Sequence, residues 1–220
     1  MKHLDREIDR LKRHVLALSA IVEENVSKAV RAVMERDNDL ATTVLRSDHQ
    51  VDTIEVEVEE ECLKILALHQ PVALDLRFIV AVLKLNNDLE RIGDLAVNIA
   101  EQVEPLSEQD AVTLPIDLRP IAKRAQMMLR DALDALVNKD PNSARSVCAA
   151  DDEVDDLHRE ISRRVTDLLS EASAPTDVTV LIRLLSVSRC LERVADLATN
   201  IAEDIIYMTE GDIVRHGHVR

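Results

Sequence analysis

The segment LERIGDLAVNIAE at residues 89–101 decides the fold, because it occurs twice in the chain. The second copy, LERVADLATNIAE, occupies residues 191–203, so Glu192 follows Glu90 by 102 residues (192 − 90). Each copy has an Asp four residues after its first Glu, then an Asn four residues later and a Glu three residues after that. Steps of three and four residues return to one face of an α-helix, so each copy is predicted to be a helix with an acidic stripe.

A second stripe in the same two segments is apolar and also advances by three and four residues. It consists of Leu85, Leu89, Ile92, Ala96, Ile99 and Val103 in the first copy, and of Leu191, Val194, Ala198, Ile201, Ile205 and Met208 in the second. Such a pattern is typical of the core-facing seam of a helical bundle. With this seam turned inward, the acidic stripe is predicted to lie on the outer face, open to water.

The composition indicates an all-helical protein. Of 220 residues, 46% are hydrophobic, only Phe78 and Tyr207 are aromatic, and three glycines are too few for a turn-rich β protein. A net charge of −15 without a basic face argues against nucleic-acid binding. No apolar run is long enough to insert into a membrane, and no apolar signal region follows Met1, so a cytoplasmic protein is expected. Its three cysteines, Cys62, Cys148 and Cys190, are expected to be buried, reduced thiols.

Periodicity and turn signals predict six helices. They are expected at about residues 5–36, 39–68, 72–103, 117–138, 141–172 and 177–209. The proline-containing stretch at about 104–116 is interpreted as a link between domains, and the tail at about 214–220 as disordered.

The duplication extends beyond the acidic segments. RDNDLA at residues 36–41 matches KDPNSA at residues 139–144, and Asp48 and Asp52 match Asp151 and Asp155 at the same offset of 103 (151 − 48). The sequence therefore predicts an all-α fold of two tandem three-helix bundles related by a pseudo-twofold axis. Residues 1–104 are assigned to the first bundle and residues 117–210 to the second.

Acidic pairs at four-residue spacing are the main candidates for a functional site. Four pairs recur between the halves: Asp48/Asp52, Glu90/Asp94, Asp151/Asp155 and Glu192/Asp196. Two such pairs on neighbouring helices would bring four carboxylates together, a set suited to magnesium, or to iron, manganese or zinc completed by water. The alternative is a solvated acidic helix face, which is common in a chain with 42 acidic residues. Because like charges at this spacing repel, the recurrence favours a cation, and both interpretations remain open here.

Several other residues extend the candidate sites. Candidates for further ligands or supporting groups are Asn98, Glu101, Asn200, Glu203, Arg91, Arg193 and His158. For the two asparagines and the two glutamates, the alternative is that they are ordinary exposed polar residues of a helix, and both interpretations remain open here. For the arginines, a salt bridge to a neighbouring acid is the simpler interpretation, and holding a carboxylate ligand in place is the functional one. The remaining histidines that lack a repeated partner, His14, His49 and His69, are interpreted as surface residues, while His216 and His218 in the tail could take up metal adventitiously. No nucleophile motif, phosphate-binding Gly-rich loop or Glu-x-x-His motif is present, so no enzyme activity is expected.

The chain resembles the PhoU family of bacterial phosphate-transport accessory and regulatory proteins. The resemblance runs from about Leu4 to Met208 and is sharpest in PVALDLR at residues 71–77, LERIGD at 89–94 and NIA at 98–100. It implies two three-helix bundles with multinuclear metal clusters on their surface. By resemblance, the ligands are Asp48, Asp52, Glu90 and Asp94 in the first half and Asp151, Asp155, Glu192 and Asp196 in the second. The chain departs from the family pattern at Leu4 and, in the second half, at Ala195, which replaces the glycine seen at Gly93.

The resemblance also implies a function. Such proteins are cytoplasmic, often homodimeric, negative regulators of phosphate uptake and of phosphate-starvation signalling. Their partners are the ATP-binding subunit of the phosphate ABC transporter and a sensor histidine kinase, and the expected role is that of a metal-binding adaptor between them. The alternative is a structural helical scaffold or a metal-storage protein with no signalling role. A metalloenzyme is a third class, against which the missing base, nucleophile and enclosed pocket argue.

Overall fold

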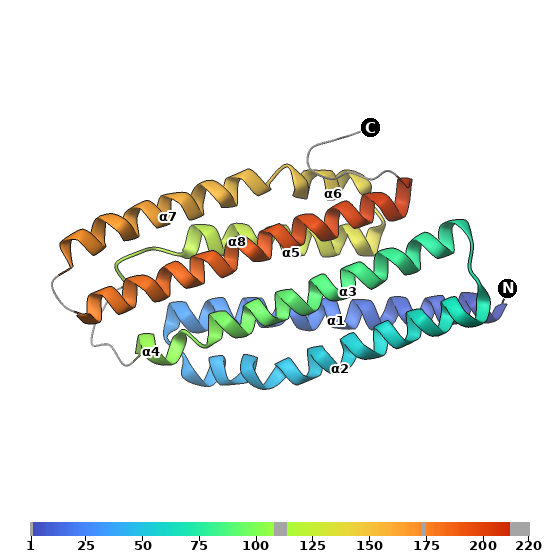
Figure 1. The fold of residues 1–220 in the computed structure, drawn as a ribbon, viewed down its shortest axis with the longest axis horizontal. Helices are drawn as coiled ribbons and strands as arrows, with labels where there is room; N and C mark the ends of the chain where they lie inside the picture. The colour runs from blue at the N-terminus through green and yellow to red at the C-terminus, as the bar shows by residue number, and fades with distance from the viewer. Residues whose placement is uncertain (1, 108–113, 173–174, 212–220) are drawn as a thin grey trace.

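The computed structural model describes residues 2–107, 114–172 and 175–211, and within these ranges the regular structure is entirely helical (Figure 1). The helices in chain order are α1 Lys2–Glu35, α2 Asn38–His69, α3 Ala73–Ala100, α4 Val103–Ser107, α5 Arg119–Asn138, α6 Pro141–Cys148, α7 Asp151–Glu171 and α8 Pro175–Glu210. The predicted fold class is therefore confirmed. In the described part of the chain, none of the helices combines the length and apolarity that crossing a bilayer requires. The predicted disorder at 214–220 falls outside the described residues.

Two of the predicted helices are each divided in the structure. The helix predicted at 141–172 is interrupted at Ala149 and Ala150, which form a turn between α6 and α7. Alanine is a strong helix former, so local propensity does not explain this break. The helix predicted at 72–103 ends at Ala100, and α4 continues three residues past the predicted domain boundary at 104. Its residues Val103 and Leu106 are buried, so packing onto the first bundle holds this extra turn.

The turns that begin the second helix of each half use the same capping chemistry. Arg36 and Lys139 adopt left-handed backbone conformations, with φ of 55° and 52°. Asp37 and Asp140 then cap the next helix, their carboxylates accepting the backbone N–H groups of Leu40 and Asn142 at 2.9 Å. A short acceptor at this position satisfies an N–H that the helix itself leaves unpaired. The duplicated sequence thus produces a duplicated turn.

The two halves are bundles that pack against each other through equivalent helices. In the first half α1, α2 and α3 contact one another, and in the second α8 packs on α5, α6 and α7. Between the halves the main contacts are α3 with α8 and α1 with α5, so each of these helices meets its own duplicate. Figure 1 shows α3 and α8 side by side along the long axis, with α2 beyond one and α7 beyond the other. Contact between equivalent surfaces is what a pseudo-twofold axis produces.

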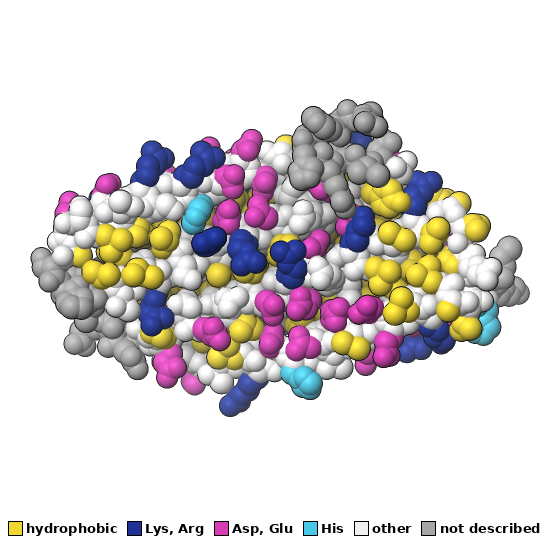
Figure 2. Space-filling model, in the orientation of Figure 1, with side chains coloured by type: hydrophobic (Ala, Val, Ile, Leu, Met, Phe, Trp, Pro, Cys, Tyr) yellow, Lys and Arg dark blue, Asp and Glu magenta, His cyan; other side chains and the backbone are white. Residues whose placement is uncertain are grey.

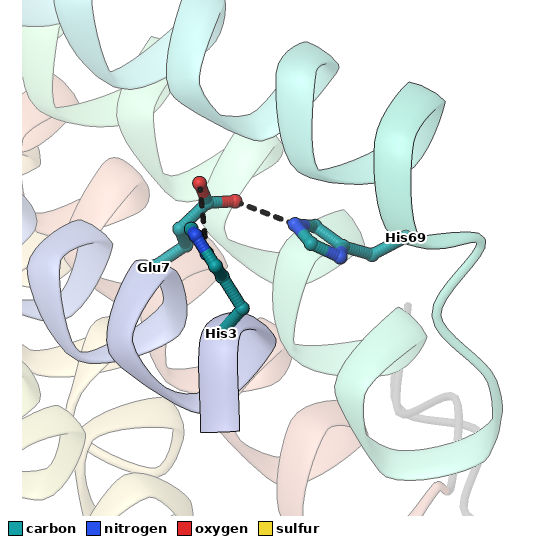
Figure 3. Close-up of side chains that lie close together, drawn as sticks. All are labelled: His3, Glu7 and His69. Carbon is teal, nitrogen blue, oxygen red and sulfur yellow. Dashed lines mark hydrogen bonds and ion pairs between the residues drawn. The ribbon is translucent and has the colours of Figure 1, made fainter. Parts of the chain in front are cut away.

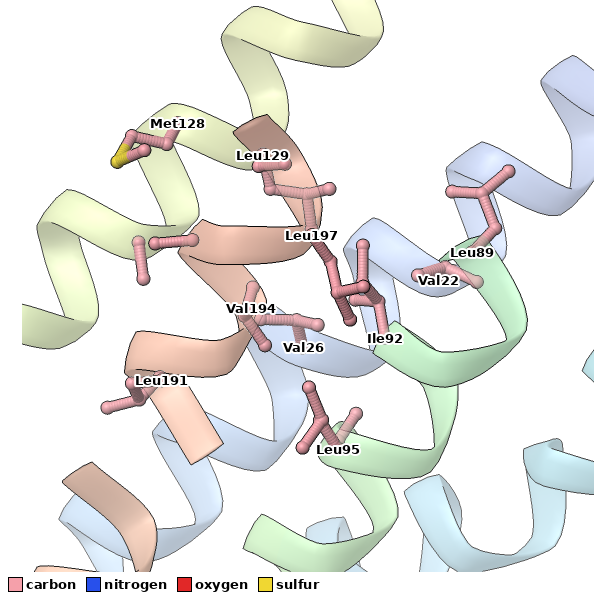
Figure 4. Packing of buried hydrophobic residues seen from close by; sticks show 14 of the residues in the cluster. Val22, Val26, Leu89, Ile92, Leu95, Met128, Leu129, Leu191, Val194 and Leu197 are labelled. Atoms are coloured by element: carbon pink, nitrogen blue, oxygen red, sulfur yellow. The ribbon is translucent and has the colours of Figure 1, made fainter. Parts of the chain in front are cut away.

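The hydrophobic core runs through both halves without interruption. The apolar seam residues of α3 and α8 are buried, and they belong to the same cluster as the valines of α1 and the leucines of α5. Figure 4 shows Ile92 and Leu95 of α3 near Val194 and Leu197 of α8, at the junction of the halves. Because α3 and α8 pack on each other as well as on their own bundles, the acids of their second stripe are confined to one exposed edge.

Candidate metal sites on one face of the two bundles

The helix pairs that carry the acids approach each other closely. In the first half the acids lie on α2 and α3, and in the second on α7 and α8. A Cβ atom added at Gly93 would lie 3.1 Å from Cγ1 of Val51, tighter than an ordinary carbon contact. Val51 sits between Asp48 and Asp52, and Gly93 directly precedes Asp94. The missing side chain therefore lets α2 approach α3 at the level of the acids.

The first cluster is formed by Asp48 and Asp52 of α2 and by Glu90 and Asp94 of α3. That these four acids share a metal ion stays a prediction. Burial raises the pKa of Asp48, and the charges of Asp52 and Asp94 raise it further. The pKa of Glu90 is raised by burial and then by Asp94, Glu55 and Asp52. Carboxylates that shift one another in this way lie within mutual electrostatic reach, although no three of them bring ligand oxygens within 4.8 Å of one another.

The second cluster is the more closely assembled of the two. Ligand oxygens of Asp155, Glu192 and Asp196 all lie within 4.8 Å of one another. Asp151 joins them from the first turn of α7, where its Oδ1 accepts a hydrogen bond from the Thr199 hydroxyl at 3.3 Å. The sequence matches the family pattern better in the first half, yet the structure brings three acids closest in the second.

The charges of the second cluster also repel one another. Partial burial raises the pKa of Asp151, as do the charges of Asp196 and Asp155. The pKa of Asp196 is raised by desolvation and then by Glu192 and Asp155, while that of Glu192 is raised by desolvation and by Asp155 and Asp151. A bound cation would remove this repulsion, so the donor set fits a metal ion.

His158 lies beside the second cluster, as its spacing from Asp155 predicts. Its Nδ1 is hydrogen-bonded to the hydroxyl of the buried Ser188 at 2.9 Å. Burial lowers the pKa of His158, as does the charge of Arg189, and Asp155 acts in the opposite direction. Because Nδ1 of this neutral imidazole is already hydrogen-bonded, Nε2 is the ring nitrogen that could bind a metal ion.

Glu55 is a residue of the first cluster that the sequence analysis missed. Burial raises its pKa, as do the charges of Glu59 and Asp52. The buried Asn86 donates from Nδ2 to the Glu55 carbonyl at 2.9 Å and to its carboxylate Oε1 at 3.3 Å. Glu55 follows Asp52 by three residues as His158 follows Asp155, and Asn86 matches Ser188, so the duplication itself was the signal that could have found it.

Arginines lie between the two clusters. Arg91 and Arg193 line an open hollow of about 290 Å³ with Asp151, Asp196, Leu197, Thr199 and Asn200. Arg91 also forms an ion pair with Asp88 at 3.5 Å. The first-half arginine thus faces the second-half acids, an arrangement that the pseudo-twofold packing of α3 on α8 produces. Both interpretations of Arg91 therefore have a structural basis: it pairs with a neighbouring acid and borders a cluster.

Figure 2 shows how these charges are distributed over one face of the molecule. Acidic side chains gather in two groups, one over α2 and α3 and the other over α7. A row of basic side chains separates them along the middle of the face, where α3 and α8 lie in Figure 1. The two clusters therefore open on the same side of the molecule.

The other residues proposed to extend the stripes differ in their surroundings. Asn200 borders the hollow next to Asp151 and Asp196. Glu203 lies towards Cys148. Burial raises the pKa of the Cys148 thiol, and the charge of Glu203 raises it further, to about 11. Asn98 and Glu101 are exposed near the end of α3. Of the described interactions, none connects the side chains of these two residues to the first cluster.

Two of the histidines interpreted as surface residues each lie beside an acid of the neighbouring helix. His69 is half-buried, and its Nε2 is hydrogen-bonded to Glu7 Oε2 at 2.8 Å. His14 lies with its Nδ1 3.2 Å from Glu61 Oε2. Both remain partly exposed, and in both cases the antiparallel packing of α1 on α2 supplies an acid that is distant in sequence. His49 is exposed, as expected, and the three cysteines are free thiols of which Cys62 and Cys190 are buried.

Comparison with known proteins identifies the family. A PhoU domain model matches residues 15–103 and again residues 118–205. The phosphate-specific transport system accessory protein PhoU homolog of Pseudomonas putida is 36% identical over 216 residues, covering 98% of this chain and 84% of the relative. The homolog of the same description from Aquifex aeolicus is 34% identical over 217 residues, covering 99% of this chain and 97% of the relative.

Solved structures agree with the sequence relatives. The crystal structure of PhoU from Pseudomonas aeruginosa superposes with a TM-score of 0.89 at 35% identity, covering 94% of this chain and 99% of that one. The phosphate transport system regulatory protein PhoU from Streptococcus pneumoniae gives a TM-score of 0.87 at 29% identity, covering 96% and 99%. Matched in both halves by the family model and along nearly its whole length by these relatives, the chain belongs to the PhoU family.

Proposed function

We propose that this protein is a metal-binding negative regulator of phosphate uptake and of phosphate-starvation signalling. It acts in the cytoplasm, as a homodimer, as an adaptor between the ATP-binding subunit of the phosphate ABC transporter and a sensor histidine kinase. Family membership and the description of its relatives as accessory proteins of phosphate-specific transport support a role in regulating that transport. An adaptor role without catalysis suits a molecule whose conspicuous surface features are charge clusters.

The observation that carries the metal part of the proposal is the mutual repulsion within each acidic cluster. Each cluster joins two helices of one bundle, α2 with α3 or α7 with α8. Bound iron, zinc, manganese or magnesium, as single ions or a multinuclear cluster, would supply the positive charge that these carboxylates lack. Asp48, Asp52, Glu55, Glu90 and Asp94 would hold it in the first half.

In the second half the corresponding ligands are Asp151, Asp155, Glu192 and Asp196, with His158 next to them. Metal binding there would fix α7 relative to α8 and neutralise an acidic surface. The partner-facing side of the molecule would then present a defined charge pattern, and partner binding would weaken at high salt.

Metal content of the second cluster tests the site. We expect Glu192→Gln combined with Asp196→Asn to remove most of the metal held by the second half, because both ligands lose their charge. Protein purified without a His tag would be measured by elemental analysis. Asp167→Asn with Glu171→Gln is the matched control: it removes the same charge at the same spacing on exposed positions of α7. Equal metal content in the two double variants would contradict the site.

A deletion strain tests the regulatory role. In ample phosphate it is expected to express phosphate-scavenging genes constitutively and to accumulate phosphate, and the wild-type gene is expected to restore repression. The cluster variant should restore it less well than its matched control. If starvation genes stay silent and uptake is normal without the protein, the scaffold or metal-storage alternative replaces the signalling function.

A further inference from the structure

A possible set of metal ligands that differs in type from the acidic clusters lies where α1 begins and α2 ends. It consists of His3 and Glu7 in the first turns of α1 and of His69, the last residue of α2. One ligand atom from each lies within 4.8 Å of the other two. His69 Nε2 is 2.8 Å from Glu7 Oε2, and His3 Nδ1 is 3.8 Å from Glu7 Oε1. Figure 3 shows both imidazole rings beside the same carboxylate.

The fold assembles this set from both ends of a helical hairpin. His3 and Glu7 are four residues apart and therefore share one face of α1. Because α2 runs antiparallel to α1, its last residue is brought beside the first turns of α1. The duplication does not repeat the arrangement, since Ala172 stands at the position that matches His69. The set is thus independent of the two acidic clusters.

We propose that His3, Glu7 and His69 form a third metal site, for a single zinc-class divalent cation. Two imidazole nitrogens and one carboxylate are a donor set found at zinc ions that keep water in the fourth position. Imidazole ligands favour zinc and its transition-metal neighbours over magnesium or calcium, which prefer oxygen. The site therefore differs in chemical class from the first acidic cluster, whose ligands are all carboxylates.

The surroundings of the three residues suit such an ion. Glu7 and His69 side chains are 17% and 23% exposed, whereas His3 is 82% exposed, so the set is anchored on one side and open to water on the other. Burial tends to raise the pKa of Glu7, but the hydrogen bond from His69 and the charge of Lys64 outweigh it and leave that pKa below its ordinary value. The carboxylate is thus in the ionised form that a metal requires.

Lys64 is the natural competitor for the cation. Its Nζ lies 3.7 Å from Glu7 Oε1, and its side chain is 57% exposed. A flexible, largely exposed ammonium can move into water when a divalent ion takes its place. The occupied site would connect the first turns of α1 to the C-terminal end of α2.

Cobalt titration of the full-length, untagged protein tests the proposal. Four-coordinate Co²⁺ absorbs visible light far more strongly than six-coordinate Co²⁺, so this site would be seen above the acidic clusters. Every protein in the titration carries His216→Gln and His218→Gln, because the tail histidines could bind metal adventitiously. We expect a saturable visible band, which Zn²⁺ abolishes by competition.

Variants show which residues bind the Co²⁺ ion that gives the band. His3→Gln and His69→Gln should each weaken Co²⁺ binding by at least about 100-fold, since loss of an outer-shell partner alone costs about 10–100-fold. His49→Gln, on an exposed histidine of α2, is the matched control and should leave the band unchanged. Lys64→Gln should tighten binding by removing the competitor, whereas a purely structural ion pair would give no such gain.

Two further comparisons keep the outcome decisive. Glu192→Gln with Asp196→Asn should leave the band unchanged, so failure of the acidic clusters to bind metal would not be mistaken for failure of this site. Circular dichroism of His3→Gln and His69→Gln checks that helix content is retained. A band that survives both histidine variants, or one that disappears equally in the His49→Gln control, would overturn the proposal.

Discussion

At the scale of single residues, the candidate clusters are defined by carboxylates held where their charges are unfavourable. The pKa values of Asp151, Glu192 and Asp196 are all raised, with desolvation as the first cause and neighbouring acids as the next. Such groups bind a proton more tightly in the folded chain than in the unfolded one. Binding of a proton therefore relieves part of the repulsion, which gives the clusters a characteristic dependence on pH.

The contribution of these cluster acids to the stability of the metal-free protein should rise as the pH falls from neutrality through their raised pKa values. These groups bind more protons in the folded state than in the unfolded state there, so their contribution to the free energy of unfolding decreases with rising pH. The gain from these groups is complete below their ordinary values of 3.8 for Asp and 4.5 for Glu. Urea denaturation after chelation, at a series of pH values, would measure it.

The comparison protein for this pH series is Glu192→Gln with Asp196→Asn. This double variant should lack much of the increase in the free energy of unfolding at low pH. At neutral pH without metal, it should be more stable than the wild type. Acids whose pKa is lowered, such as Glu7 and Asp140, act in the opposite direction, but they are present in both proteins and cancel in the difference. Identical pH slopes in the two proteins would show that the cluster carboxylates do not repel in the folded state.

At the scale of helices, the distance between α2 and α3 is set by the absence of one side chain. Gly93 is fully helical and buried, so its role is to permit close approach rather than an unusual backbone angle. The second half has Ala195, also buried, at the equivalent position. The two halves therefore have different residues, Gly93 and Ala195, at the equivalent helix contact. Their acidic clusters also differ in compactness.

Gly93→Ala should lower the free energy of unfolding by about 1 kcal/mol. The new methyl group would meet Val51 at 3.1 Å, and overpacking costs about 1–3 kcal/mol, while the better helix propensity of Ala returns about 0.5–1 kcal/mol. Urea denaturation measures the change. In a Val51→Ala background the same substitution should become neutral or stabilising, which a double-mutant cycle would reveal. A stabilising Gly93→Ala in the wild-type background would refute the close approach.

At the scale of the whole molecule, the two bundles share one core and are not independent units. Helices α3 and α8 each bury a second face besides the apolar seam, because each packs on its duplicate as well as on its own bundle. An ion pair from Lys84 Nζ to the buried Asp204 Oδ1, at 3.0 Å, crosses the same junction, and this ammonium also lies 5.1 Å from the centre of the Tyr207 ring. The halves are therefore expected to unfold together.

Leu197→Ala tests this cooperativity. Leu197 is 3% exposed at the junction of α3 and α8, so the cavity should cost about 2–5 kcal/mol. Circular dichroism should show one transition shifted to lower urea, and hydrogen exchange should speed up in α1–α3 as well as in the second half. Leu63→Ala, at a leucine that is 53% exposed, should change stability by less than about 0.5 kcal/mol. Two separated transitions in Leu197→Ala would mean that the bundles unfold independently.

Much of this architecture could be predicted from the sequence because the signals are local. The three- and four-residue steps of the seam predict helices without knowledge of any distant contact, and the caps that Asp37 and Asp140 form in the structure are likewise local interactions. The repeat at an offset of 102–103 residues predicts two like bundles. The eight acids were found in the same way, since spacing along one helix determines which side chains share a face.

Only the tertiary structure decided which helices meet and how closely. The pairing of α3 with α8 places Arg91 beside the acids of the other half, and the hairpin of α1 and α2 brings His69 to Glu7 across 62 residues. The turn at Ala149 and Ala150 gave no local signal. Periodicity determines the face on which a side chain lies, whereas the rotation, crossing and spacing of two helices depend on the packing of the whole core. For this reason the sequence predicted the acids, and packing decided that the second cluster is the tighter one.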